Sequence, residues 1–151
     1  MSNHEKHAWA SLLVAILVWL YFTMRMTAGW AIAEVTVRHM IWTYIAVIIL
    51  LIVAHALIAV ALAALVARDA GEAVKDERDR ALEARAERVE GYVVLAAINI
   101  LIIHALAHAA LGHVLPHIEL TSLPTLVFVL LSTLFAGHAA KQVALIWMYR
   151  K

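Results

Sequence analysis

The chain has 151 residues, of which 65% are apolar, and its mean hydropathy of +0.87 is too high for an ordinary soluble domain. Its 12 Lys and Arg are balanced by 11 Asp and Glu, which gives no basic surplus of the kind that nucleic-acid partners require. It has no cysteine, which excludes disulfides, thiolate metal sites and cysteine nucleophiles. We therefore expect a polytopic membrane protein with one domain over residues 1–151.

Four apolar segments follow one another, each long enough for a membrane-spanning helix. They cover residues 8–27, 41–66, 91–115 and 124–149. A hydrocarbon core of about 30 Å requires about 20 helical residues. Because lipid offers no hydrogen bonds to the backbone, these segments must be helical. The sequence thus predicts an all-α, integral membrane four-helix bundle with short outer loops.

The connection between the second and third spans is rich in Ala, Glu and Arg and has no proline. Opposite charges also recur at helical spacing, as with Asp76 and Arg80. These features predict a charged cytoplasmic helix over residues 72–90 that continues into the third span. Its charges fit either a solvated helix face or a docking site for a cytoplasmic regulator.

The positive residues determine the expected orientation. The face that carries both termini holds most of them: Lys6, Arg68, Lys75, Arg78, Arg80, Arg85, Arg88, Lys141, Arg150 and Lys151. The opposite face has only Arg25 and Arg38. Since cytoplasmic loops carry the excess of Lys and Arg, both termini are predicted to be cytoplasmic, with the bacterial inner membrane as the expected location.

Four histidines lie inside the predicted spans, where polar side chains are costly and usually functional. Counted from the span ends, His55, His104 and His138 fall at similar depths near the midplane. His108 follows His104 by four residues and so lies on the same helix face, one turn nearer the outer surface. This layer of imidazoles is the main functional signal in the sequence.

The leading interpretation is a site for one b-type haem. Small residues flank each histidine and leave room for a flat macrocycle. His55 or His138 would ligate the iron from one side, and His104 or His108 from the other. Electrons would pass to or from a quinone or a redox protein, as in a membrane oxidoreductase or electron-transfer subunit.

Three further residues are expected to contribute to this site. Phe135 would pack against the porphyrin, while Arg25 or Lys141 would pair with its propionates. Lys141 also has a simpler role, because its long stem can reach the cytoplasmic headgroups.

A transition-metal site for zinc or copper is an alternative use of the same four histidines. The predicted spans contain no Asp or Glu to neutralise a dication, and this favours a neutral-ligand cofactor instead. A second, outer cluster of His39, His113 and His117 could also bind metal.

A function without any cofactor is the other alternative: a membrane accessory or sensor whose helix over residues 72–90 binds a regulator. Small-residue faces on the later spans permit a homodimer. The sequence Asp76-Glu77-Arg78, followed by Asp79-Arg80 and Ala84-Arg85-Ala86, resembles the cytoplasmic motif of a family of small four-span bacterial and archaeal membrane proteins of unknown function. That resemblance implies the same four-span topology and a regulatory accessory role.

Overall fold

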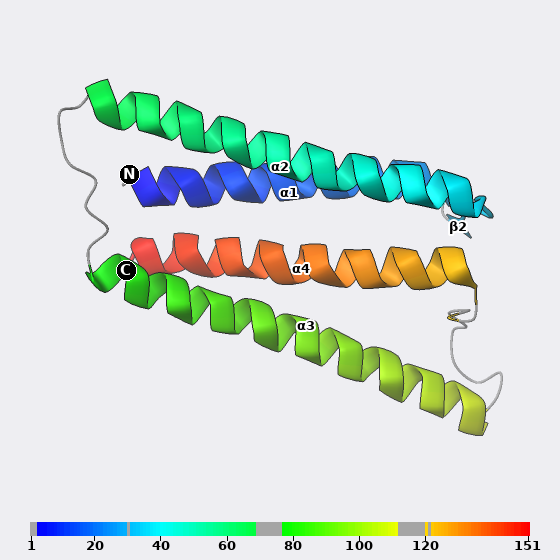
Figure 1. Ribbon diagram of the computed structural model, residues 1–151. Coiled ribbons are helices and arrows are strands. Elements are labelled where there is room, and N and C mark those ends of the chain that lie inside the picture. Colours follow the sequence, from blue (N-terminus) through cyan, green and yellow to red (C-terminus); the bar gives the residue numbers. More distant parts are fainter. Residues whose placement is uncertain (1–2, 30, 69–76, 112–119, 121) are drawn as a thin grey trace.

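The protein is a bundle of four long helices. The computed structural model describes residues 3–29, 31–68, 77–111, 120 and 122–151. The helices are α1 (Asn3–Met26), α2 (Val37–Arg68), α3 (Glu77–Leu111) and α4 (Leu123–Tyr149). They run up and down, with both chain ends at the same end of the bundle (Figure 1). All four are long and apolar enough to cross a membrane, so the predicted all-α membrane four-helix bundle is confirmed.

A short β-hairpin joins α1 to α2 and was not expected from the sequence. Its strands are β1 (Thr27–Ala28) and β2 (Ala31–Ile32), which pair antiparallel. Gly29 in the turn has a φ of +68°, a conformation that costs glycine little and other residues more. The hairpin closes the end of the bundle opposite the termini.

Helices α1 and α4 form the centre of the bundle, because α1 packs on both α2 and α4, and α4 also packs on α3. The largest buried cluster draws on α1, α2 and α4: Ala15, Val18, Phe22, Met26, Met40, Val47 and Phe135. The peripheral helices α2 and α3 expose many large apolar side chains, as expected of surfaces that face lipid.

Polar contacts fix the antiparallel alignment of α1 and α4. The indole Nε1 of Trp19 donates a hydrogen bond to Ser132 Oγ at 3.2 Å. Towards the termini, Arg150 Nε donates to Glu5 Oε1 at 3.1 Å, and its guanidinium lies 5.6 Å from the ring centre of Trp9. These contacts, from the middle and the end of the helices, hold the two chain ends together.

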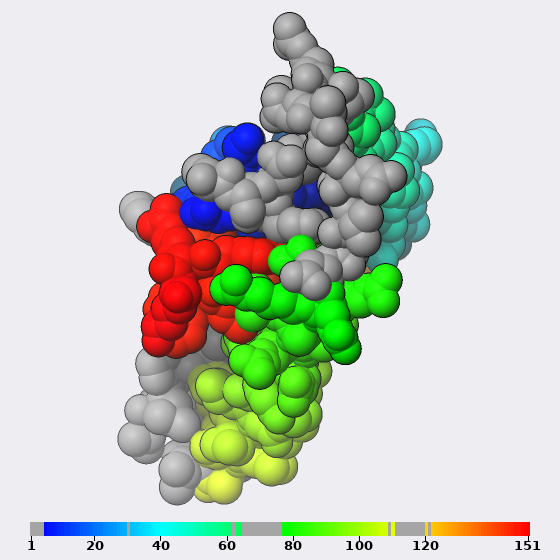
Figure 2. Space-filling model, turned by 90° about the vertical axis from the view of Figure 1, so that its left-hand side faces the viewer, coloured from blue at the N-terminus to red at the C-terminus, as the bar shows by residue number. Residues whose placement is uncertain are grey.

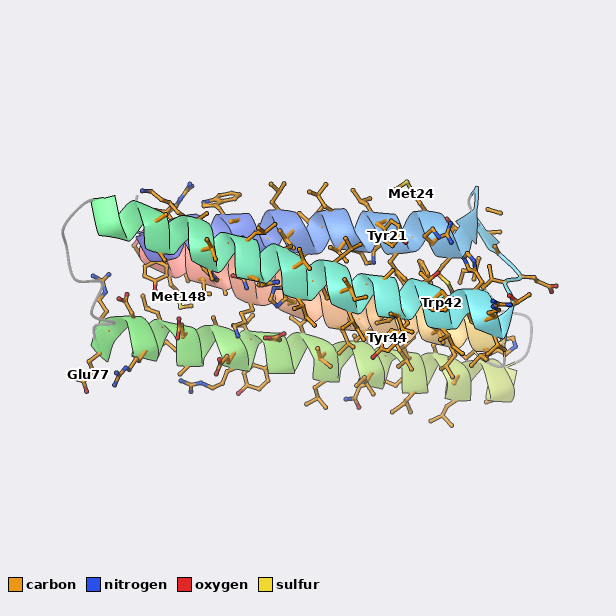
Figure 3. The ribbon with its side chains drawn as sticks, turned by 45° about the horizontal axis from the view of Figure 1, so that its top comes forward. Tyr21, Met24, Trp42, Tyr44, Glu77 and Met148 are labelled. Atoms are coloured by element: carbon orange, nitrogen blue, oxygen red, sulfur yellow. The ribbon has the colours of Figure 1, made fainter. Side chains whose placement is uncertain are left out.

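Helix α3 is continuous, as the sequence predicted for a charged helix that runs into the third span; residues 72–76 lie outside the described residues. Its first residue, Glu77, lies at the same end of the bundle as Met148 of α4 (Figure 3). Lys141 Nζ of α4 contacts Glu87 Oε1 at 3.4 Å, which aligns the charged half of α3 with α4. The charged part of α3 therefore packs beside a membrane-spanning helix, although the sequence placed it entirely below the membrane.

Candidate histidine and carboxylate site

Two of the four histidines lie close together. His55 of α2 and His138 of α4 have ring centres 6.0 Å apart, with ring planes at 74°. Each lies near the middle of its helix. Because α2 and α4 run in the same direction, residues at similar distances from the starts of the two helices lie at similar depths. The expectation that these two residues share a level is confirmed.

The hydrogen bonds of the pair leave one nitrogen of each ring as a lone-pair donor. His55 Nδ1 lies 2.8 Å from the carbonyl oxygen of Leu51, which can only accept, so Nδ1 carries the proton and Nε2 does not. The amide nitrogen of Gln142 donates to His138 Nε2 at 3.3 Å, which makes that nitrogen an acceptor and places the proton of His138 on Nδ1. Nε2 is therefore the atom of each ring that could bind a metal, and in His138 it would first have to release the bond from Gln142.

A carboxylate from α3 completes the site. Glu90 Oε1 lies 3.9 Å from His138 Nδ1, and Glu90 Oε2 lies 3.6 Å from Lys141 Nζ. The side chains of Glu90 and Lys141 are 32% and 21% exposed, so both are mostly buried within the bundle. Two ions of opposite sign at this depth stabilise each other, since neither has water to replace its partner.

A cavity of about 330 Å³ lies beside the pair, between α2, α3 and α4. Its lining consists of Tyr44, Val47, Ile48, Leu51, His55, Glu90, Leu131, Leu134, Phe135 and His138. A second cavity of about 400 Å³ extends away from the termini between α2 and α4 and shares Tyr44, Leu131 and Leu134 with the first. The two helices that carry the histidine pair are thus separated by an apolar slot, with the imidazoles and Glu90 at its polar end.

His104 and His108 are not part of this site, and the expectation that His104 shares the level of His55 and His138 is wrong. Glu90 is the α3 residue level with His138, and His104 follows it by 14 residues, or about 21 Å along the helix. His104 therefore lies near the start of α4. Its Nε2 is buried and accepts no hydrogen bond from the described residues. His108 is half-buried one turn further along.

Of the other predicted site residues, Phe135 and Lys141 lie at the histidine pair, whereas Arg25 lies at the hairpin end of the bundle. Phe135 is buried and lines the cavity of the histidine pair. Lys141 is at the site but pairs with Glu87 and Glu90. Arg25 lies in the last turn of α1, at the hairpin side, where its carbonyl oxygen accepts a hydrogen bond from His39 Nε2 at 3.1 Å, so the structure does not bring it to the pair.

Of the three histidines in the predicted outer metal cluster, the structure describes His39. His113 and His117 lie outside the described residues. Across the described part of the chain, no three His, Asp or Glu side chains converge closely enough to hold a metal ion. A bare ion would thus find two imidazoles at the histidine pair without a third close protein ligand.

Sequence analysis did not assign Glu90 and Gln142 to the site. Glu90 directly precedes the apolar segment of α3 and was counted with the cytoplasmic helix. The available signal was Lys141, a cation well inside the fourth span, which requires a counter-charge at its own depth. Glu87 and Glu90, spaced by three residues on one helix face, supply it.

Comparisons of the chain with protein-family models, with curated proteins and with solved structures find no match.

Proposed function

We propose that this protein binds one b-type haem between α2 and α4, with His55 and His138 as the axial ligands. The observation that carries the proposal is the separation of the two imidazole rings, 6.0 Å between centres. With metal–nitrogen bonds of about 2.0 to 2.1 Å, two imidazoles on opposite sides of one iron have ring centres about 6 Å apart. The pair thus has the spacing of a bis-histidine site.

The number of close protein ligands favours haem over a bare transition-metal ion. A tetrahedral zinc or copper site needs three or four donors, whereas the close donor set here consists of two imidazoles. A haem brings four equatorial nitrogens of its own and asks the protein for two axial ligands. The slot between α2 and α4 has mainly apolar walls beside the two imidazoles, which is the kind of surrounding that a macrocycle requires.

The surrounding residues orient and tune the two ligands. The bond from His55 Nδ1 to the Leu51 carbonyl fixes one ring with Nε2 directed away from its own backbone. Glu90 faces Nδ1 of His138, where a carboxylate increases the basicity of the ring. Ligation by His138 Nε2 replaces the long hydrogen bond from Gln142. The haem would supply one-electron transfer, which we propose to be with a membrane quinone or a redox protein.

We further propose that the protein resides in the bacterial inner membrane with both termini in the cytoplasm. The asymmetric distribution of Lys and Arg along the chain supports this orientation. The ion pairs of α3 then lie on the cytoplasmic side of the haem site.

A visible absorption spectrum of the full-length protein, purified in detergent from cells supplied with a haem precursor, tests the proposal. We expect a Soret band that shifts on reduction with dithionite and that is lost in His55→Ala and in His138→Ala. His104→Ala and His108→Ala are the matched controls. They remove imidazoles near the C-terminal end of α3, away from the histidine pair, and should keep the band. A colourless wild-type protein with a normal helical circular dichroism spectrum would refute haem binding, and metal analysis of the same sample would then test for a bare ion.

A further inference from the structure

The two histidines of the pair differ in what occupies Nε2, the atom of each ring that would bind iron. The hydrogen bond of the His55 ring joins Nδ1 to the Leu51 carbonyl oxygen, and its Nε2 has no partner among the described residues. His138 Nε2 instead accepts a hydrogen bond from the side-chain amide of Gln142, one turn along α4, at 3.3 Å. One ring is therefore ready to bind a metal, whereas the other is occupied by a neighbour on its own helix.

Gln142 is enclosed by the bundle. The residue is 5% exposed, and its Oε1 atom is buried without a hydrogen-bond partner in the described part of the chain. Figure 2 views the bundle from the end that carries the termini and shows the C-terminal part of α4, in red, between α1 in blue and α3 in green. Within the described residues, the bond to His138 is thus the hydrogen bond that holds the Gln142 side chain.

The charges around His138 support the direction of this hydrogen bond. Glu90 Oε1 lies 3.9 Å from His138 Nδ1, and Glu90 Oε2 lies 3.6 Å from Lys141 Nζ. An ionised carboxylate can only accept, so it favours the tautomer that has its proton on Nδ1 and a lone pair on Nε2. The Gln142 amide donates to this lone pair, and iron would require the same lone pair. Gln142 and iron therefore compete for one atom.

Binding of iron to His138 Nε2 leaves the Gln142 amide without this acceptor. The side chain is buried where water does not replace the lost bond. The loss of a partner by a buried polar group corresponds to a change of about 5- to 150-fold in an equilibrium constant. The hydrogen bond in the empty site and the unpaired amide in the filled site both weaken binding. His55 carries no such cost, because its Nε2 has no bond to release.

We propose that Gln142 keeps the haem exchangeable by competing with iron for His138 Nε2. His55 is then the persistent axial ligand and His138 the labile one. This inference rests on the proposed function, because it concerns the same two ligands, and it adds that the protein takes up and releases haem. Gln142 is a positioning residue, since it acts on the iron only through His138.

The rate of haem release measures this competition. The full-length protein in detergent is loaded with haem and mixed with an excess of apomyoglobin, and the transfer is followed at the Soret band. Gln142→Leu and Gln142→Ala both remove the amide but differ in side-chain volume. We expect both variants to release haem more slowly than the wild type, by about fivefold or more.

Thr133→Val is the matched control. Thr133 is also buried on α4, but its hydroxyl donates to the Val129 carbonyl oxygen. The substitution thus removes one buried hydrogen bond from the same helix and keeps the size of the side chain. We expect haem release at the wild-type rate. Circular dichroism verifies that each variant is folded.

The protein without haem provides a second measurement. In nitrogen NMR spectra of isotope-labelled histidine, Gln142→Leu should shift the Nε2 resonance of His138 more than that of His55. An unshifted His138 resonance, or haem release that is unchanged or faster in both Gln142 variants, would overturn the role of Gln142 and leave haem binding intact. A wild-type protein without a Soret band would refute haem binding and this inference with it.

Discussion

His138 and Glu90 come from different helices, and the Nδ1 atom of one lies 3.9 Å from the Oε1 atom of the other. Lys141, one turn along α4, lies 3.6 Å from the second carboxylate oxygen of Glu90. One carboxylate thus joins an imidazole and an ammonium group inside a bundle whose other side chains at this level are mainly apolar. The stability of α3 against α4 should depend on this arrangement.

Replacing Lys141 with methionine should destabilise the protein by about 1 to 3 kcal/mol, the range for removing one partner of a mostly buried polar pair. Methionine keeps the stem of the side chain but leaves Glu90 without its counter-charge. Reversible unfolding in mixed detergent micelles measures the loss.

Two further variants distinguish the ion pair from packing. Glu90→Gln combined with Lys141→Met should be more stable than Lys141→Met alone, because no unpaired carboxylate remains. Glu87→Gln should cost less than about 1 kcal/mol, since the Glu87 side chain is 64% exposed. Equal losses for Glu87→Gln and Lys141→Met would show that the Glu90 contact is not the important one.

The sequence was sufficient to predict the bundle and half of the histidine site. Apolar length located all four helices, and the Ala, Glu and Arg content of the second connection predicted the continuous start of α3. His55 and His138 could be placed at one level because α2 and α4 run in the same direction. The hairpin at Gly29 was missed because strands of two residues leave almost no pattern in a sequence.

The position of α3 along α4 could not be predicted by counting. The count assumed that Gly91, the first residue after the charged segment, lies at the membrane boundary. The helix is instead displaced along α4. Glu87 and Glu90 contact Lys141, and Val94 packs directly against Gly137. Such pairwise contacts decide the alignment of two helices and do not appear in the hydropathy pattern.

Gly137 of α4 should tolerate no side chain, because α3 packs directly against it. A Cβ added there would lie 2.5 Å from Val94 Cγ2, closer than any real contact, with the Glu90 carbonyl oxygen 3.5 Å away. Gly137→Ala should therefore destabilise the protein by about 1 to 3 kcal/mol, as overpacking of a close interface does. The loss is measured by the same unfolding assay.

Val94→Ala should restore stability to Gly137→Ala, since it removes the methyl group that the new Cβ would meet. In the wild-type background, Val94→Ala should itself be destabilising, because it leaves a void beside Gly137. Additive losses in the double variant would contradict the alignment of α3 on α4 described above.

The hydrogen bond from Trp19 Nε1 to Ser132 Oγ joins α1 to α4. Ser132→Ala should leave the indole N–H without an acceptor in an apolar surrounding and cost about 1 to 2 kcal/mol in the unfolding assay. In a Trp19→Phe background, residue 19 has no N–H group that could lose its acceptor. The same Ser132→Ala change should then cost less than about 0.5 kcal/mol. An equal cost in both backgrounds would mean that Ser132 stabilises the bundle by packing and not by accepting this hydrogen bond.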